Sequence, residues 1–225
     1  MSRLRLPVPA LIAALGLLCA CRGEPPPHHP DWVIHGRLEF LAADLASAWH
    51  PPAYRLVFPY ICGDLYGAPT TGDFIRPAIT ADGRFRIDLN RTHATLLQSL
   101  EPTDFSLSYL RITPAQARLA RLAPTAFELG GIEQVGRAQW IDGRSHRMLL
   151  LVYVDRPARI SGQTLIRGRS VRFDVQARAA NYIWIEDRRD SAGDVYREVP
   201  APSELILAVT PLESASGQQS GSGQR

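Results

Sequence analysis

The sequence of 225 residues predicts a mostly β protein, an antiparallel β-sandwich with short connecting helices, and three observations support this prediction. Apolar and polar residues alternate over 84–89, and the same alternation returns over 171–176. Successive side chains of a strand point to opposite faces, so this period of two indicates half-buried strands. The run 148–154 is apolar at every position, which is typical of a central strand covered on both faces.

The other strands are predicted from short runs rich in β-branched and aromatic residues that are bounded by Pro, Gly or Asp. In chain order they lie around 36–40, at 54–58, 74–79 and 105–112, as two short strands within 125–142, and at 182–185 and 205–209. Between 74–79 and the strand at 84–89, Ala81-Asp82-Gly83 is a turn signal. We therefore expect these two strands to form a hairpin.

Three short helical segments are predicted between the strands. One is a helical turn after the first strand, within 42–50, and one covers 92–100. The third covers 113–122, where Thr113 can cap the helix, Pro114 suits its first position, and a glutamine follows the cap three residues later. Its apolar residues recur at the spacing of one helix face, so we expect this segment to connect two halves of the chain.

The domain organisation follows from these elements. We expect a leader at 1–20, a Pro-rich tether at 21–30, a sandwich-like module at 31–112, a helical connector at 113–124, a second β-rich module at 125–212 and a disordered tail at 213–225. One domain spanning 31–212 is the alternative. The tether is stiff because Pro-rich chain is extended, and the tail of Ser, Gly and Gln lacks the apolar residues for a core.

The first 21 residues have the pattern of an export signal. Arg3 and Arg5 precede an uncharged apolar stretch, 6–20, that is shorter than a membrane-spanning helix. The sequence Leu18-Cys19-Ala20-Cys21 resembles the lipobox of bacterial lipoproteins. This resemblance implies cleavage before Cys21, acylation of Cys21 with palmitate-like chains, and a membrane anchor in the cell envelope. A cleaved signal peptide that leaves a soluble secreted protein is the alternative.

The residue after this cysteine bears on the destination of the protein. Arg22 stands there and not aspartate, and by resemblance to known lipoprotein sorting patterns this favours the outer membrane, with the protein facing the periplasm.

Farther along, Asp-Gly-Arg-Phe-Arg-Ile-Asp-Leu at 82–89 follows an earlier Gly-containing strand. Residues 31–90 thereby resemble transthyretin-like and carboxypeptidase-regulatory-like β-sandwich modules. That resemblance implies a fold and no catalytic residue.

The charge of the chain argues against nucleic acid as a partner. All 25 basic residues are Arg; without the two in the leader, 23 Arg face 22 acidic residues, a net side-chain charge of +1. Nucleic-acid binding proteins need a larger basic excess.

The densest basic cluster is a candidate anion-binding patch for lipid phosphates, lipopolysaccharide or an acidic partner, with a solvated sheet face as the alternative. It comprises Arg156, Arg159, Arg167, Arg169 and Arg172.

Few motifs of catalysis occur. The sequence has no His-Glu-x-x-His, Gly-x-Ser-x-Gly or Cys-x-x-Cys, so we predict no catalytic residue, no metal and no cofactor. A hydrolase would need a site from scattered residues, and the best candidates are His35 or His50 with Asp64 or Asp73. The favoured function is a lipid-anchored, non-enzymatic binding or structural module whose partner is an envelope protein or lipopolysaccharide. The alternatives are a carrier of lipid or another small ligand, and an envelope hydrolase.

Cysteine and tryptophan are expected to serve the core. After lipidation of Cys21 only Cys62 remains, so no intramolecular disulfide is expected, and Cys62 is predicted to be a small buried residue. The four tryptophans are predicted to lie in the core or at its rim and not to form a sugar-stacking platform. They are Trp32, Trp49, Trp140 and Trp184.

Overall fold

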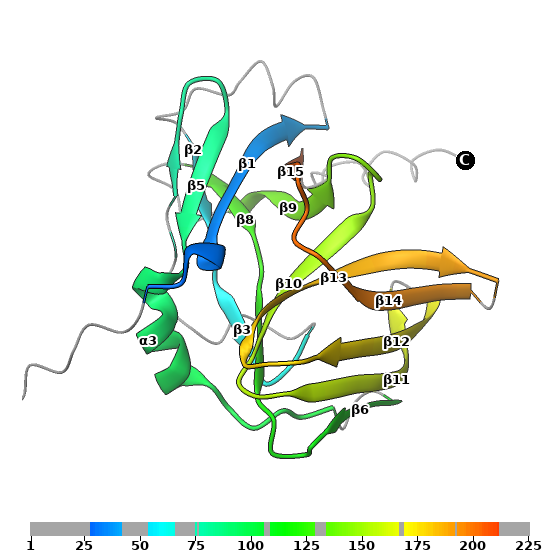
Figure 1. Ribbon diagram of the computed structural model, residues 1–225. Coiled ribbons are helices and arrows are strands. Elements are labelled where there is room, and N and C mark those ends of the chain that lie inside the picture. The colour runs from blue at the N-terminus through cyan, green and yellow to red at the C-terminus, as the bar shows by residue number, and fades with distance from the viewer. Residues whose placement is uncertain are drawn as a thin grey trace, which may run out of the picture.

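A computed structural model confirms the mostly β fold. It describes residues 28–41, 54–65, 75, 77–105, 109–128, 134–166, 169–191 and 193–211. The leader at 1–20, the helical turn predicted within 42–50 and the tail at 213–225 lie outside the described residues, as do Cys21, Trp49 and most of the tether. Within the described ranges the chain forms 15 strands, one short 3₁₀ helix and one α-helix (Figure 1).

The elements of the first half are η1 (Pro30–Trp32), β1 (Val33–Phe40), β2 (Tyr54–Val57), β3 (Tyr60–Cys62), β4 (Ala78–Ile79), β5 (Arg84–Asp88), α3 (Asn90–Ser99) and β6 (Tyr109–Thr113). Those of the second half are β7 (Leu119–Leu122), β8 (Thr125–Glu128), β9 (Gln134–Asp142), β10 (Met148–Val154), β11 (Ala158–Ile166), β12 (Arg169–Ala177), β13 (Asn181–Asp190), β14 (Gly193–Val199) and β15 (Leu205–Pro211). The helix predicted at 92–100 is confirmed as α3, and the predicted hairpin at 74–89 is confirmed as β4 and β5.

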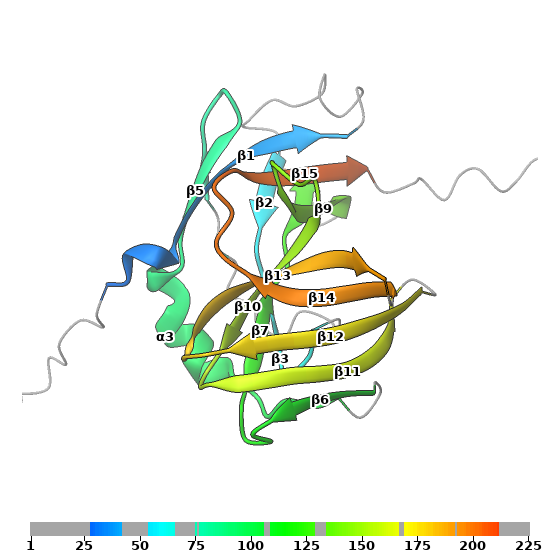
Figure 2. The ribbon, with the colours of Figure 1, turned by 45° about the vertical axis from the view of Figure 1, so that its right-hand side comes forward.

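The strands form one twisted, mixed sheet that folds over on itself. Its main path runs β4-β5-β1-β15-β9-β10-β13-β14-β12-β11-β6, and β2, β3, β7 and β8 branch from β9 and β10. The pairs β1·β15 and β12·β14 are parallel, and every other pair among the described strands is antiparallel. Figures 1 and 2 show β1, β5 and β15 in one layer and β14, β12, β11 and β6 in another.

Two apolar clusters lie on the two faces of β10. Leu149, Leu151 and Tyr153 pack into the first core, together with α3, β1, β5 and β15. The alternate residues of β10, Leu150 and Val152 among them, pack into the second core against β6, β11, β12, β13 and β14. The prediction of a central strand covered on both faces is therefore confirmed.

The helix predicted at 113–122 is wrong. β6 ends at Thr113, whose peptide bond to Pro114 is cis, and the chain turns into β7. Leu119 faces the second core, whereas Ala120 and Leu122 face the first. A short apolar run of this kind fits both the helical and the strand period. The segment forms a strand because β7 pairs with β10 on one side and with β3 on the other.

Strand pairs also cross the predicted connector. β1 pairs with β15, β2 with β8, β3 with β7, and β6 with β11. The chain before residue 113 is thus hydrogen-bonded through four strand pairs to the chain after it. The pairing of β6 with β11 matters most for function, because these two strands and β12 form the groove described next.

Candidate functional site

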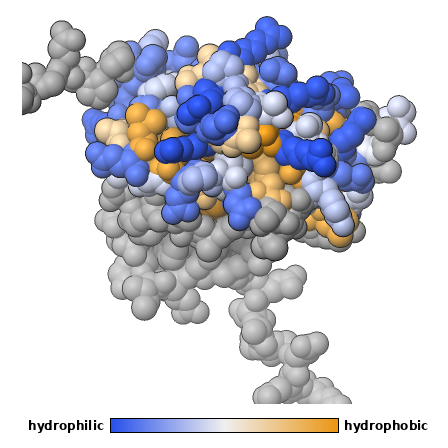
Figure 3. All heavy atoms as spheres, turned by 90° about the horizontal axis from the view of Figure 1, so that it is seen from below, coloured by the Kyte–Doolittle hydropathy of each residue, from blue (hydrophilic) through white to orange (hydrophobic). Residues whose placement is uncertain are grey.

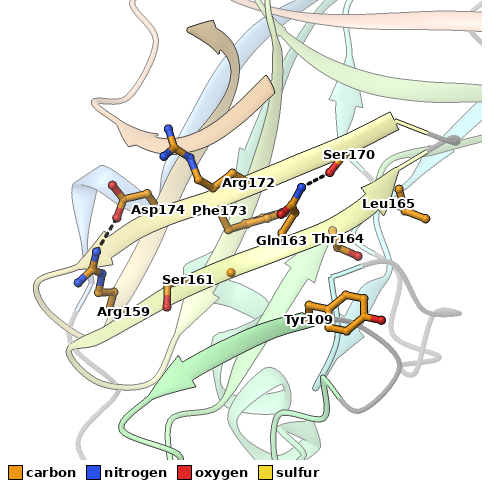
Figure 4. Close-up of a pocket in the computed structure, with 11 residues that line it drawn as sticks. Tyr109, Arg159, Ser161, Gln163, Thr164, Leu165, Ser170, Arg172, Phe173 and Asp174 are labelled. Carbon is orange, nitrogen blue, oxygen red and sulfur yellow. Dashed lines mark hydrogen bonds and ion pairs between the residues drawn. The ribbon is translucent and has the colours of Figure 1, made fainter. Parts of the chain in front are cut away.

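The main candidate site is a surface groove over β6, β11 and β12. It has a volume of about 810 Å³ and is lined by 11 residues, all from these three strands (Figure 4). This volume falls within the roughly 300–1,000 Å³ that ligand sites usually have. The groove lies on the outer side of the strands whose inner side closes the second core.

The alternation of the sequence places the lining. In β12, Val171, Phe173 and Val175 are buried in the second core, so Arg172 and Asp174 point outward. The register of β11 with β12 sets Ser161 opposite Asp174 and Gln163 opposite Arg172. The register of β6 with β11 then sets Tyr109 opposite Gln163. Side chains 50 or more residues apart in the sequence thereby come together on one face.

A glycine in β11 allows β6 to approach this closely. Gly162 has φ +121°, a conformation that side chains disfavour, and a Cβ atom there would lie 2.2 Å from the carbonyl oxygen of Tyr109. The backbone of β6 therefore occupies the space that any other residue at position 162 would need. The shape of the groove depends on this contact.

One end of the groove is polar. Arg159 donates to Asp174 with Nη2 3.1 Å from Oδ1, and both side chains are half exposed. Gln163 Nε2 donates to Ser170 Oγ, and Arg172 and Ser161 contribute further polar groups. These groups offer donors and acceptors on rigid strands, which suits them to fix a polar ligand in one orientation.

The other end is apolar and open to water. Tyr109 is 87% exposed and Leu165 is 73% exposed, and Figure 4 shows both toward the end away from the Arg159–Asp174 pair. Figure 3 views the molecule from below, toward β6 and β11, and shows separate apolar patches among hydrophilic side chains. An aromatic ring this exposed contributes little to folding, so its contact surface remains for a ligand.

The structure brings together only part of the predicted arginine patch. Arg159 and Arg172 share the groove. Arg156 lies in the turn after β10, where its guanidinium binds the Asp155 carboxylate at 3.0 and 3.1 Å. Arg169 forms an ion pair with Asp194 of β14, and Arg167 lies outside the described residues.

The candidate hydrolase residues do not form a dyad in the described part of the chain. His35 is exposed on β1 opposite Arg86, and Asp64 follows β3. β1 and the end of β3 lie apart in both ribbon views (Figures 1 and 2). His50 and Asp73 lie outside the described residues. A base and its orienting partner need hydrogen-bond contact, so His35 and Asp64 do not act together.

A second polar cluster lies between α3, β3 and β13 in the first core. The hydroxyls of Tyr60 and Tyr182 are 2.8 Å apart, and Tyr60 also contacts Thr92 Oγ1 at 3.4 Å. Trp32 Nε1 donates to Asn181 Oδ1 at 2.5 Å. Burial raises the pKa of Tyr60 and of Tyr182, so both phenols stay protonated at neutral pH and neither serves as a base.

His93 of α3 packs against the same cluster. Its ring lies 4.3 Å from that of Trp32 and 5.0 Å from that of Tyr153, measured between ring centroids. Burial, and secondarily the charge of His29, lowers the pKa of His93, so the imidazole is neutral near pH 7. Its Nδ1 atom is buried and has no hydrogen-bond partner among the described residues. The cluster packs within the first core, and we interpret it as structural.

In the ranges that the structure describes, no group of three or more His, Cys, Asp and Glu is arranged to hold a metal ion. None of the described helices is long and apolar enough to cross a membrane.

The sequence predictions for the core residues hold where they are described. Cys62 is buried in β3, and Trp32, Trp140 and Trp184 are each at most 8% exposed.

The sequence reasoning did not identify Tyr109, Gln163 or Ser170 as site residues. Their signal was the period of two in β6, β11 and β12, which puts them on the outward faces, but the pairing of these strands was not visible.

No family model, no curated protein and no solved structure matches this chain.

Proposed function

We propose that this protein is a lipid-anchored binding protein of the bacterial cell envelope and that it binds its partner in the groove over β6, β11 and β12. The observation that supports this most is the groove itself, with Tyr109 and Leu165 exposed at one end and an arginine–aspartate pair at the other. Ligand sites combine an apolar contact surface with a few fixed polar groups in this way.

The groove fits binding better than catalysis. Its charged side chains are Arg159, Arg172 and Asp174, and it contains no His, Cys, Glu or Lys among its lining residues. The carboxylate of Asp174 is engaged by Arg159 in an ion pair of 3.1 Å. A groove of this chemistry can hold and orient a polar ligand through fixed donors and acceptors.

The anchor in this proposal rests on the lipobox-like sequence before Cys21. Each buried acyl CH₂ group contributes about 0.8 kcal/mol, so two or more chains hold a protein durably at a membrane. The tether that follows contains four prolines between Glu24 and Asp31, and an extended Pro-rich chain spans about 3.1 Å per residue. It would keep the folded part at a short distance from the lipid surface, within reach of envelope components.

The anchor is tested by the intact mass and the membrane fractionation of the protein, compared with Cys21→Ala. We expect a mature chain that begins at Cys21 and carries a lipid mass, and we expect the variant to lose both the lipid and the membrane association. An unmodified wild-type chain in the soluble fraction would refute the anchor.

The binding surface is tested by photo-crosslinking in cells. A photo-crosslinking amino acid replaces Ser170, which is exposed in the groove, and in a matched protein it replaces Leu97, which is 46% exposed on α3. We expect adducts with envelope material at position 170 and none at position 97. Equal labelling at both positions, or none at either, would show that the groove is not the binding surface.

A further inference from the structure

We infer that the groove over β6, β11 and β12 binds a carbohydrate chain that carries acidic groups. This inference rests on the proposed binding function and names its ligand class. It is drawn from three features of the groove: one exposed aromatic ring, a row of hydroxyl and amide side chains, and a small excess of positive charge.

The exposed ring is Tyr109. Its side chain is 87% exposed although it lies in a strand, and its ring stands at the edge of the groove (Figure 4). A pyranose ring has one face of C–H groups that packs on an aromatic surface, while its hydroxyls point outward to polar partners. Tyrosine suits this role because the ring supplies apolar area and its hydroxyl supplies a hydrogen bond.

The polar row lies across the strands from this ring. Gln163 is opposite Tyr109 in the register and donates to Ser170, while Ser161 lies two residues before Gln163 on the same face of β11. Amide and hydroxyl groups both donate and accept, which matches the hydroxyls of a sugar. Because these groups stand on paired strands, little conformational entropy is lost when they bind.

The charge of the groove favours an acidic sugar. Two arginines, Arg159 and Arg172, face one carboxylate, Asp174, so the lining has a net charge of +1. One N–H group of Arg159 donates to Asp174, and the planar guanidinium keeps further N–H groups that suit a carboxylate or phosphate. Arg111, exposed and opposite Ser161 in the register, extends the positive charge along β6.

The same features disfavour a protein or a lipid as the occupant. Protein interfaces bury an apolar centre within a polar rim, but here the exposed apolar side chains, Tyr109 and Leu165, lie at one end of a polar groove. A lipid chain needs an apolar enclosure, whereas this groove is open and its floor carries Arg172 and Asp174.

The test uses the full chain purified in detergent and two probes, tetragalacturonate as an acidic tetrasaccharide and chitotetraose as a neutral one. Isothermal titration calorimetry measures the Kd of each for the wild type, Tyr109→Ala, Tyr109→Phe, Arg172→Gln and the remote control Leu97→Ala. We expect the acidic probe to bind at least fivefold more tightly than the neutral one. Tyr109→Ala should weaken binding of the acidic probe at least tenfold, and Tyr109→Phe should weaken it by a smaller factor because the ring stays and only the hydroxyl is lost. Arg172→Gln should remove most of the preference for the acidic probe, and the remote control Leu97→Ala should stay within about threefold of the wild type.

Thermal unfolding of each variant, run beside the titrations, identifies any variant that fails to fold. Acidic sugars occur in both peptidoglycan and lipopolysaccharide, so pelleting with peptidoglycan sacculi and with lipopolysaccharide aggregates distinguishes the two sources. Failure of the wild type to bind either tetrasaccharide and either envelope polymer overturns the carbohydrate inference. If crosslinking at position 170 still gives adducts in that case, the proposed binding function stands with another ligand; if it gives none, both fail.

Discussion

Replacing Gly162 with alanine tests whether the close approach of β6 to β11 shapes the groove. A matched control exists in the same chain, because Gly193 has φ +122° and Gly162 has φ +121°. A Cβ at Gly162 would lie 2.2 Å from the Tyr109 carbonyl oxygen, whereas a Cβ at Gly193 would meet nothing within 4 Å. The two substitutions therefore place a side chain at the same φ and differ in steric overlap.

The expected magnitudes follow from this difference. A side chain in such a backbone conformation costs about 1–3 kcal/mol, and this is the whole effect expected for Gly193→Ala. In Gly162→Ala the oxygen must also move by most of an ångström to leave the range below 3.0 Å that real Cβ atoms avoid. Overpacking that shifts the backbone typically costs about 1–3 kcal/mol more. For Gly162→Ala we expect the free energy of unfolding to fall by about 2–6 kcal/mol in total. If detaching β6 from β11 costs less than this, we expect β6 to detach instead.

Two measurements separate these outcomes. Urea unfolding followed by tryptophan fluorescence gives the free energy of unfolding, because Trp32, Trp140 and Trp184 are buried. Hydrogen exchange at the amides of β6 detects local release of this strand. Gly162→Ala should exceed Gly193→Ala in lost stability or in β6 exchange. Equal behaviour of the two variants in both measurements would refute the reasoning.

Two further predictions concern the buried polar cluster. Burial lowers the pKa of His93, so its imidazole stays neutral in the native state at pH values where the unfolded chain already binds a proton. The contribution of the neutral imidazole to the free energy of unfolding is therefore fully present above about pH 6.5. It is lost as the pH falls through the lowered pKa. Urea unfolding from pH 7.5 to 5 should show the wild type losing stability relative to His93→Gln, by less than about 1.4 kcal/mol per pH unit, and parallel curves would contradict this. Tyr60→Phe should cost about 1–2 kcal/mol because it leaves the Tyr182 hydroxyl without the partner 2.8 Å away, while adding Tyr182→Phe should cost less than the sum of the single changes. Additive losses in thermal unfolding would argue against the hydrogen bond.

The elements that the sequence predicted well are those whose pattern is local and long enough. The alternation over 171–176 became β12, with its apolar residues in the second core, and the run at 148–154 became the central strand β10. In both, burial on one face or on two follows directly from the spacing of apolar residues. The segment at 113–122 failed because its few apolar residues fit two periods, and only its partners β10 and β3 decide between them.

The candidate site depends on pairing that the sequence does not display. The arginine cluster at 156–172 was found from the density of arginines along the chain, but successive residues of a strand point to opposite faces. Arg169 accordingly pairs with Asp194 of β14, whereas Arg172 lines the groove. Tyr109 was missed because the period of two in its own segment indicates an outward face but does not place that face beside β11. Its neighbours in the groove lie 50 or more positions later in the sequence, and strand order is fixed by the whole sheet.

The sequence by itself determined the strand-forming character of this chain and the burial of Cys62, Trp32, Trp140 and Trp184. It also carries the leader pattern on which the proposal of export and lipidation rests. Those properties follow from residue type and from spacing over a few positions. Tertiary structure alone decided that β1 and β15, from opposite ends of the chain, lie side by side, and that β6 packs on Gly162 to form the groove. Long-range strand pairing depends on the joint burial of two cores by many segments at once, so no local pattern specifies it.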